Sequence, residues 1–287
     1  MGYVDDAFAN LKRTNEVSPT AEGAASRRQR AIREAVRASW DLDDDFLTGS
    51  YRRETKIKPL QDVDMFVVVD PDGSQGSYRA KTPGDVLAAL RGVLEAKYDS
   101  VTIDRMACTV GFGSESEIVS FDVVPAFKLA SGGYGIPDSQ RGVWIKTNPK
   151  LHHELSTAKN SRCDQRFVPF VKMAKAINRD LGGPVTPSFL IEVMAWQLVT
   201  EPFGRYQDEV RWFLASAVEG VDRAWPDPAG LGPDVNTMSS AQRANAAKAL
   251  RGALAVAEEA IRLEDDGQER AAVEAWRRLF GNRMPRP

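Results

Sequence analysis

Residues 61–69 read QDVDMFVVV, and this stretch decides the fold. The apolar run predicts a buried strand, yet the strand opens with Asp62 and Asp64. Because side chains at positions i and i+2 of a strand point to the same face, we expect the two carboxylates to lie together, roughly 6–7 Å apart along the strand. Packing gives no reason for acids at the head of a buried strand. Carboxylate oxygens are ligands that Mg²⁺ prefers, and this ion also keeps coordination positions for phosphates.

A second apolar run, EIVSFDVVP at residues 117–125, carries Asp122 in its interior. An aspartate is disfavoured inside a strand, and it is costly if buried without a partner. Convergence of Asp122 with Asp62 and Asp64 on two cations would offset that cost. Two metal ions about 3.5–4 Å apart stabilise both the attacking and the leaving oxygen of a phosphoryl displacement. The three aspartates are therefore the predicted catalytic residues and metal ligands, with two Mg²⁺ ions as cofactors and Mn²⁺ as an alternative.

Residues 48–53 read TGSYRR and supply a candidate phosphate site. Gly49 allows the backbone to approach a ligand closely, and Ser50 at a helix start lies beside N–H groups that attract anions. We predict a short helix over residues 51–57 that is ended by Pro59. Asp-x-Asp alone also marks turns or solvated strand edges, and Gly-Ser alone is less specific still. The joint pattern favours a nucleotidyltransferase site in which Gly49 and Ser50 bind nucleotide phosphates.

With these motifs in place, the chain resembles the nucleotidyltransferase superfamily of DNA polymerase β type. More narrowly, it resembles the bacterial cGAS/DncV-like nucleotidyltransferases (CD-NTases), which are relatives of cyclic GMP-AMP synthase and oligoadenylate synthase. The resemblance covers nearly the whole chain. It rests on residues 48–51 (TGSY), 57–60 (IKPL), 62–64 (DVD), 121–127 (FDVVPAF), 171–178 (VKMAKAIN), 188–192 (SFLIE) and 276–281 (WRRLFG).

The resemblance implies an α+β fold, with a polymerase β-like nucleotidyltransferase core made of a mixed sheet with helices, plus a C-terminal helical domain. The expected molecule is bilobed, with the active site in the cleft. We place the catalytic core with its N-terminal helices at residues 1–150, and the helical domain that closes the nucleotide cleft at residues 151–287. Within the core, local patterns predict strands at 65–69, near 101–110 and at 117–124, and a helix over 83–98.

The resemblance also assigns nucleotide-binding residues to the helical domain. In the family, a helix lysine and a downstream serine contact the donor triphosphate, and by position these are Lys175 and Ser188. Phe189 is a candidate to stack on the donor base, or else a core residue. Asn160 is a candidate to read a base edge, or else a helix-end or loop residue. Lys172 and Lys175 share one helix face, for which a solvated surface is the alternative.

The activity implied by the resemblance is Mg²⁺-dependent, template-independent joining of nucleoside triphosphates into a cyclic di- or trinucleotide. The product would activate an effector protein in antiphage (CBASS-type) signalling. Two other interpretations stay open: a nucleotidyltransferase that modifies an RNA end, a small molecule or a protein, and a non-catalytic nucleotide-binding regulator. The presence of all three aspartates disfavours the regulator.

The composition of the chain indicates which binding partners and which cellular location to expect. The chain has 287 residues, 43% of them hydrophobic, which suffices for one large domain or two ordinary ones. A net charge of −2 and a pI of about 5.9 argue against a general nucleic-acid coat. Cys108 and Cys163 suggest reduced thiols, and no cluster has zinc-ligand spacing, so we expect no DNA activator. Without a signal peptide or a membrane span, we expect a cytoplasmic monomer.

Overall fold

The computed structural model describes residues 2–58, 60–113 and 118–287. Pro59 and Glu117, which the sequence patterns placed at a helix end and a strand start, lie outside the described residues. The predicted α+β class is confirmed, because a mixed sheet with helices is followed by a helical C-terminal region.

The chain divides into two compact units that are not continuous in sequence. We call them the sheet unit and the helical unit. The sheet unit comprises residues 17–154 and 229–233, and the helical unit comprises the residues up to Glu16 together with 155–228 and 234–287. The N-terminal helix thus groups with the C-terminal helices and not with the sheet.

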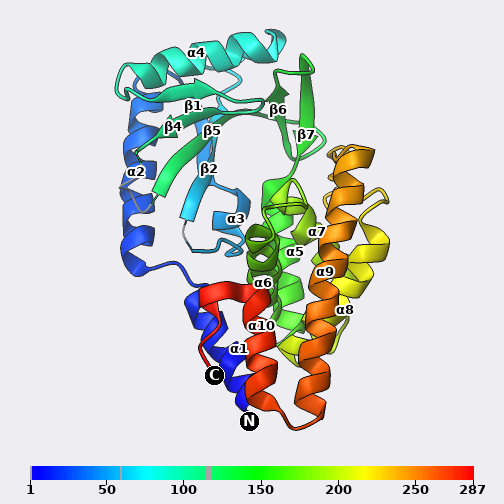
Figure 1. Cartoon of the computed structure of the whole chain (residues 1–287). Helices are drawn as coiled ribbons and strands as arrows, with labels where there is room; N and C mark the ends of the chain where they lie inside the picture. Colours follow the sequence, from blue (N-terminus) through cyan, green and yellow to red (C-terminus); the bar gives the residue numbers. More distant parts are fainter. Residues whose placement is uncertain (1, 59, 114–117) are drawn as a thin grey trace. The chain divides into compact units, whose positions relative to one another are not determined.

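A mixed sheet and several helices form the sheet unit (Figure 1). The strand order is β1-β2-β5-β4-β3, with β6 paired to β5 and β7 paired to β6. β2 and β5 run parallel, and the other neighbouring strands run antiparallel. The strands are β1 (Leu42–Leu47), β2 (Leu60–Val69), β3 (Val101–Ile103), β4 (Cys108–Gly111), β5 (Ile118–Lys128), β6 (Tyr134–Asp138) and β7 (Val143–Thr147). The helices are α2 (Pro19–Arg37), α3 (Gly49–Arg52) and α4 (Pro83–Glu95), and α5 (Pro149–Arg162) begins in this unit.

Alternate residues of β2 enter apolar clusters on opposite faces of the sheet. Val63 and Met65 pack on the face that α2 and α4 cover (Figure 1). Phe66 packs in the other cluster, with side chains from β5 and β6. Because side chains alternate along a strand, Asp62 and Asp64 belong to this second face, which points away from α2 and α4.

The helix after β1 lies earlier in the chain than we predicted from residues 51–57. α3 starts at Gly49, two residues before the predicted start. Glu54 has a φ of 59°, a left-handed conformation that breaks a right-handed helix. The Thr55 N–H then donates to the Ser50 carbonyl at 3.0 Å and closes a turn. The prediction failed because it relied on Pro59 to end the helix.

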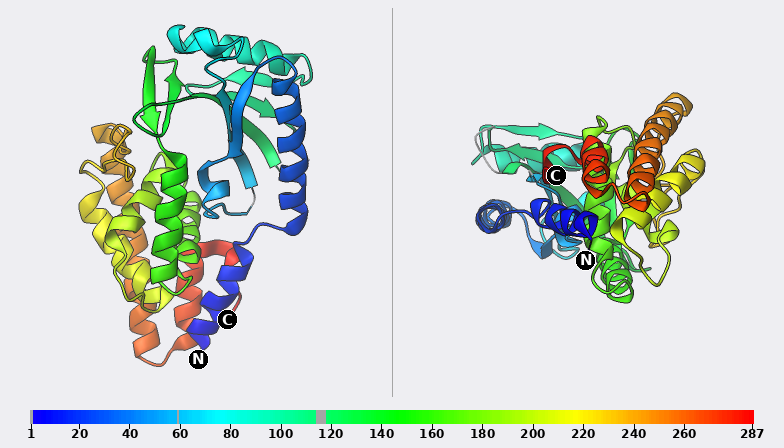
Figure 2. Two further views of the ribbon diagram at one scale, coloured as in Figure 1. Left: turned by 180° about the vertical axis from the view of Figure 1, so that it is seen from behind. Right: turned by 60° about the horizontal axis from the view of Figure 1, so that its bottom comes forward.

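Helices from both ends of the chain build the helical unit. α6 is almost entirely buried and contacts α1, α7, α8 and α10. α1 and α10 lie side by side (Figures 1 and 2). In the described chain, no helix has the length and apolar character needed to cross a membrane. The helices are α1 (Tyr3–Thr14), the end of α5, α6 (Phe167–Asp180), α7 (Ser188–Leu198), α8 (Tyr206–Gly220), α9 (Ser240–Asp265) and α10 (Glu269–Phe280).

Aromatic contacts join α1 to α10. Trp276 is fully buried, and its ring meets Phe8 edge-on with 5.1 Å between centroids. Phe280 also meets Phe8 edge-on, at 5.9 Å. Edge-to-face pairs add to the stabilisation from burial itself. This aromatic cluster attaches the N-terminal helix to the rest of the helical unit.

Truncation of Trp276 should therefore destabilise the helical unit strongly. We expect Trp276→Ala to lower the free energy of unfolding by about 3–5 kcal/mol, because a large core side chain is lost and a cavity remains. Trp212, with 49% of its surface exposed, provides the matched control. Trp212→Ala should change the free energy by no more than about 0.5 kcal/mol. Urea unfolding followed by circular dichroism measures both free energies. Equal losses of stability in the two variants would contradict the role of Trp276 as a core residue of the helical unit.

An ion pair between half-buried Arg105 and buried Asp138 connects the β3–β4 turn to the end of β6. Arg105 Nε donates to Asp138 Oδ1 at 2.9 Å, and Nη2 donates to Oδ2. The Asp138 carboxylate has no exposed surface. Its hydrogen bonds with Arg105 hold the pKa of Asp138 below the ordinary aspartate value. Its stabilising effect is therefore present at neutral pH and is lost as the pH falls through the folded-state pKa, below about 4.

Asp138→Asn should lower the free energy of unfolding by about 2–3 kcal/mol at pH 7, because charge-assisted hydrogen bonds are lost. The difference from the unaltered protein should shrink at pH 3, where the aspartate itself becomes protonated. Exposed Asp99 gives the control Asp99→Asn, whose difference should stay small at both values. Urea titrations at each pH test this, and a difference that grows toward acid would refute it.

Candidate active site

The parallel pairing of β2 with β5 brings the three aspartates to one face of the sheet. In this register Asp64 lies directly beside Asp122, and Asp62 lies beside Ser120. Neighbouring strands are about 4.8 Å apart, so the Asp64 and Asp122 backbones are in direct contact. Asp62 is exposed, whereas Asp64 and Asp122 are half-buried. The structure thus brings together the three acids that the sequence pattern selected.

Gly49 lies directly against the middle aspartate. β1 ends beside β2, where the Thr48 N–H donates to the Asp64 carbonyl at 2.9 Å. Gly49 follows with a φ of +60°, and a Cβ built at Gly49 would lie 1.7 Å from Asp64 Oδ2. Any residue other than glycine at this position would therefore require the Asp64 carboxylate to shift. The backbone of Gly49, the first residue of α3, therefore packs directly against the Asp64 side chain.

Burial and charge act together on Asp122. Burial raises the pKa of the Asp122 carboxyl above its ordinary value, and the negative charges of Asp62 and Asp104 raise it further. The Thr109 hydroxyl opposes this shift by donating to Asp122 Oδ1 at 2.6 Å. Like charges gathered on a partly buried face are unfavourable unless a cation or a proton joins them.

The donor set fits divalent metal ions. All three candidates offer carboxylate oxygens, the ligands that hard cations such as Mg²⁺ take. Among the described residues, no group of three or more His, Cys, Asp or Glu side chains is placed to hold a metal ion by itself. Mg²⁺ does not require such a cage, because it keeps several waters and is usually held by one or two carboxylates plus substrate phosphates. Asp62, Asp64 and Asp122 are accordingly the residues that would hold it.

Both lysines singled out on α6 are buried, so the alternative of a solvated helix face is wrong. Lys172 is 4% exposed, and its Nζ lies 2.6 Å from Glu16 Oε2. Lys175 is 8% exposed, and its Nζ donates to Glu192 Oε1 of α7 at 3.2 Å. Glu192 is itself 1% exposed. The predicted contact of Lys175 with a triphosphate stays a prediction.

The other residues assigned by resemblance also lie in the helical unit. Ser188 is exposed at the first position of α7. Phe189 is half-buried, packs against the core of the unit and meets the Trp196 ring edge-on at 5.7 Å. The Asn160 amide accepts from the Val168 N–H at 2.9 Å, so it joins the end of α5 to the start of α6. These positions suit the structural alternatives for Phe189 and Asn160, and their nucleotide contacts remain predictions.

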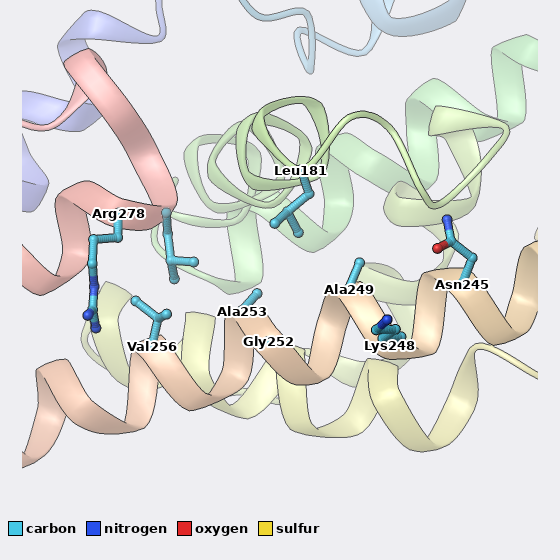
Figure 3. A pocket seen from close by; sticks show the side chains of 9 residues that line it. Leu181, Asn245, Lys248, Ala249, Gly252, Ala253, Val256 and Arg278 are labelled. Atoms are coloured by element: carbon cyan, nitrogen blue, oxygen red, sulfur yellow. The ribbon is translucent and has the colours of Figure 1, made fainter.

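Each unit also carries a cavity among its described residues. In the sheet unit, a cavity of about 510 Å³ adjoins β1, Thr48, Arg52, Lys150 and His153. In the helical unit, a groove of about 410 Å³ runs between α9, α10 and the end of α6 (Figure 3). Leu181, Asn245, Lys248 and Arg278 are among the side chains that line it. Neither cavity is lined by the three aspartates.

Sequence reasoning missed Thr109, which contacts Asp122 directly. The predicted strand near residues 101–110 contained it, and a hydroxyl residue within an apolar strand was the available signal. The contact depends on the β4–β5 register, which places Thr109 opposite Asp122. A local pattern does not encode that register.

An Asp-x-Asp pair and a third aspartate lie on adjacent parallel strands, with a glycine turn against Asp64. This arrangement fits the pattern that we expected for a nucleotidyltransferase of polymerase β type. The sequence model of the Second Messenger Oligonucleotide or Dinucleotide Synthetase (SMODS) domain matches residues 1–160. This match spans more than half of the chain, and the chain belongs to that family. The predicted resemblance to the cGAS/DncV-like nucleotidyltransferases is thereby confirmed, and the protein is a nucleotidyltransferase.

Individual relatives agree with this family. A probable cyclic nucleotide synthase of Bacillus cereus (strain VD146) is 27% identical over 271 residues, covering 83% of this chain and 81% of that protein. The cyclic AMP-AMP-AMP synthase of an Acinetobacter species is 28% identical over 309 residues, covering 97% and 84%. The structure of the Bradyrhizobium diazoefficiens CD-NTase CdnG in complex with GTP aligns with a TM-score of 0.77 at 14% identity, covering 99% and 97%. That structural likeness shows the fold.

Gly49→Ala should impair nucleotidyl transfer by about 10²-fold, because the new Cβ displaces the Asp64 carboxylate and misplacement of a reacting group costs about that much. Gly142 is the matched control, since its φ is +68° and a Cβ there meets nothing within 4 Å. Gly142→Ala carries the same backbone strain and should keep nearly full activity. Initial rates of pyrophosphate release compare the two, and equal losses would assign the effect to strain alone.

Proposed function

We propose that this nucleotidyltransferase joins nucleoside triphosphates, without a template, into a cyclic di- or trinucleotide. The observation that carries the proposal is the Asp64–Asp122 register pair, with Asp62 on the same face and Gly49 against Asp64. The SMODS family is described as synthetases of oligonucleotide or dinucleotide second messengers. Two relatives named as cyclic nucleotide synthases align over 83% and 97% of the chain, which supports a cyclic product.

In the proposed reaction, a ribose hydroxyl of the acceptor attacks the α-phosphorus of the donor in line. The new bond joins that oxygen to phosphorus, the bond from phosphorus to the β-bridging oxygen breaks, and pyrophosphate leaves. Asp62 and Asp64 would hold Mg²⁺, or Mn²⁺ in its place, for the triphosphate end of the donor. Asp122, together with them, would hold metal for the acceptor end and would accept the proton of the hydroxyl. Bound metal would neutralise phosphate charge and lower the pKa of the acceptor hydroxyl.

The turn at Gly49 and Ser50 is proposed to bind the β- and γ-phosphates. Gly49 has no side chain, so the backbone at the start of α3 is accessible beside Asp64. Ser50 is half-buried at the next position. Phosphate oxygens could accept hydrogen bonds from backbone N–H groups and from the Ser50 hydroxyl. In the last transfer, the free ribose hydroxyl at one end of the linear intermediate would attack the α-phosphorus of the triphosphate at the other end. Pyrophosphate would leave, and the ring would close.

We further propose that the cyclic product activates an effector protein in antiphage (CBASS-type) defence. This part of the proposal rests on the resemblance to the cGAS/DncV-like family. No DNA activator is required, and the chain would act on nucleoside triphosphates alone. Addition of the purified product to candidate effectors would test this step independently of the chemistry.

Incubation of the purified protein with all four nucleoside triphosphates and Mg²⁺, followed by mass spectrometry, tests the chemistry. We expect a phosphatase-resistant cyclic product. Asp62→Asn combined with Asp64→Asn should reduce its rate by more than about 10³-fold, because the groups that stabilise charge at phosphorus are removed. Exposed Asp99 supplies the control Asp99→Asn, which should retain full activity.

Removal of metal with EDTA should stop the reaction, and added Mg²⁺ or Mn²⁺ should restore it. Circular dichroism should show that the double variant remains folded. Activity that survives in the double variant would refute the site. Exclusively linear products, or transfer only to an RNA end, a small molecule or a protein, would refute cyclic synthesis while leaving nucleotidyl transfer intact.

A further inference from the structure

Thr109 lies where it can control the orientation of Asp122. β4 and β5 are antiparallel, and Thr109 is directly opposite Asp122 in their register. Side chains of directly opposite residues share a face, with Cβ atoms about 4.5–5.5 Å apart. Thr109 therefore belongs to the face that carries the three aspartates, whereas its neighbours Cys108 and Val110 are fully buried in the cluster on the opposite face.

The contact between the two side chains is short and directional. The Thr109 hydroxyl donates to Asp122 Oδ1 at 2.6 Å in a partly buried setting. This distance is typical of a charge-assisted O–H···O⁻ hydrogen bond, which is stronger than one between neutral groups. Threonine is also stiff at χ1 because it is branched at Cβ, so little rotamer freedom is lost when the bond forms. A strand threonine is well suited to fix one carboxylate oxygen.

We infer that Thr109 is a positioning residue that holds Asp122 by Oδ1 and directs Oδ2 to metal and acceptor. This inference rests on the proposed function. Mg²⁺ demands near-octahedral geometry, so a ligand that rotates freely binds it less well. Groups that hydrogen-bond to metal ligands typically contribute 10- to 100-fold in metal affinity or activity. Thr109 touches no substrate in this scheme and acts through Asp122.

Three variants isolate the hydroxyl. Thr109→Val removes it while keeping the branched shape, and Thr109→Ser keeps it while removing the methyl group. Thr102 is the matched control, because it lies opposite Thr109 on β3, is exposed, and is one strand further from Asp122. Thr102→Val should match the unaltered protein in every measurement. If Thr109→Val does not fold, as judged by circular dichroism, Thr109→Ala takes its place.

The first readout is metal binding without turnover. Mn²⁺ is titrated into the protein with a donor analogue that cannot be cleaved between the α- and β-phosphates, and free Mn²⁺ is followed by electron paramagnetic resonance. We expect Thr109→Val to weaken Mn²⁺ binding by about 10- to 100-fold and Thr109→Ser by less than about threefold. In steady-state assays, kcat should fall for Thr109→Val while KM for the nucleoside triphosphates changes little.

Two results would overturn the inference. Thr109→Val could bind Mn²⁺ and turn over as the unaltered protein does, or Thr109→Ser could lose as much as Thr109→Val. Failure of the proposed function looks different: the unaltered protein would then form no nucleotide product, and Asp62→Asn with Asp64→Asn would leave Mn²⁺ binding unchanged. If the unaltered protein forms the cyclic product and Thr109→Val behaves in the same way, the result rejects only the positioning role of Thr109. The proposed function would then stand.

Discussion

The parallel pairing of β2 with β5 is the constraint on which the candidate active site depends. A slip of one residue in a strand register turns every side chain to the opposite face. Such a slip would place Asp64 where Met65 now packs beneath α2 and α4, and burial of an unpaired carboxylate there is prohibitively costly. The apolar face therefore fixes the register, and the register in turn fixes Asp64 beside Asp122. Core packing and site geometry are two consequences of one alternation along β2.

Backbone groups of residues 48 and 49, and not side chains, contact Asp64 from the end of β1. The Thr48 N–H bonds the Asp64 carbonyl, and Gly49 then passes the Asp64 carboxylate at a distance that no Cβ could share. This main-chain contact limits where the Asp64 carboxylate can lie. On the other flank, Thr109 engages a single oxygen of Asp122. The acids are thus bounded on both sides by elements of the same sheet unit.

Local patterns predicted the parts of the site that lie within one strand or one turn. Alternation placed Asp62 and Asp64 on one face, and the second apolar run identified Asp122. Thr109 was not predicted because its contact depends on register between strands, and the end of α3 was misplaced because Glu54 adopts a left-handed φ. The burial of Lys172 was equally invisible, since its partner Glu16 lies 156 residues away in the chain. Long-range partners decide whether a polar residue within a helix is solvated or paired.

The pair between Lys175 and Glu192 bears on the predicted contact of Lys175 with a triphosphate. Both groups are almost fully buried, and a break in a buried ion pair costs about 3–5 kcal/mol because one charge is left uncompensated. A triphosphate that captured Lys175 outright would therefore have to offset that loss. An ammonium group carries three donors, however, and Glu192 Oε1 accepts from Lys175 along one direction. A phosphate oxygen that used another donor would leave the pair intact, so the predicted role of Lys175 requires no exchange of partners. The carboxylate would then orient the ammonium group instead of competing for it.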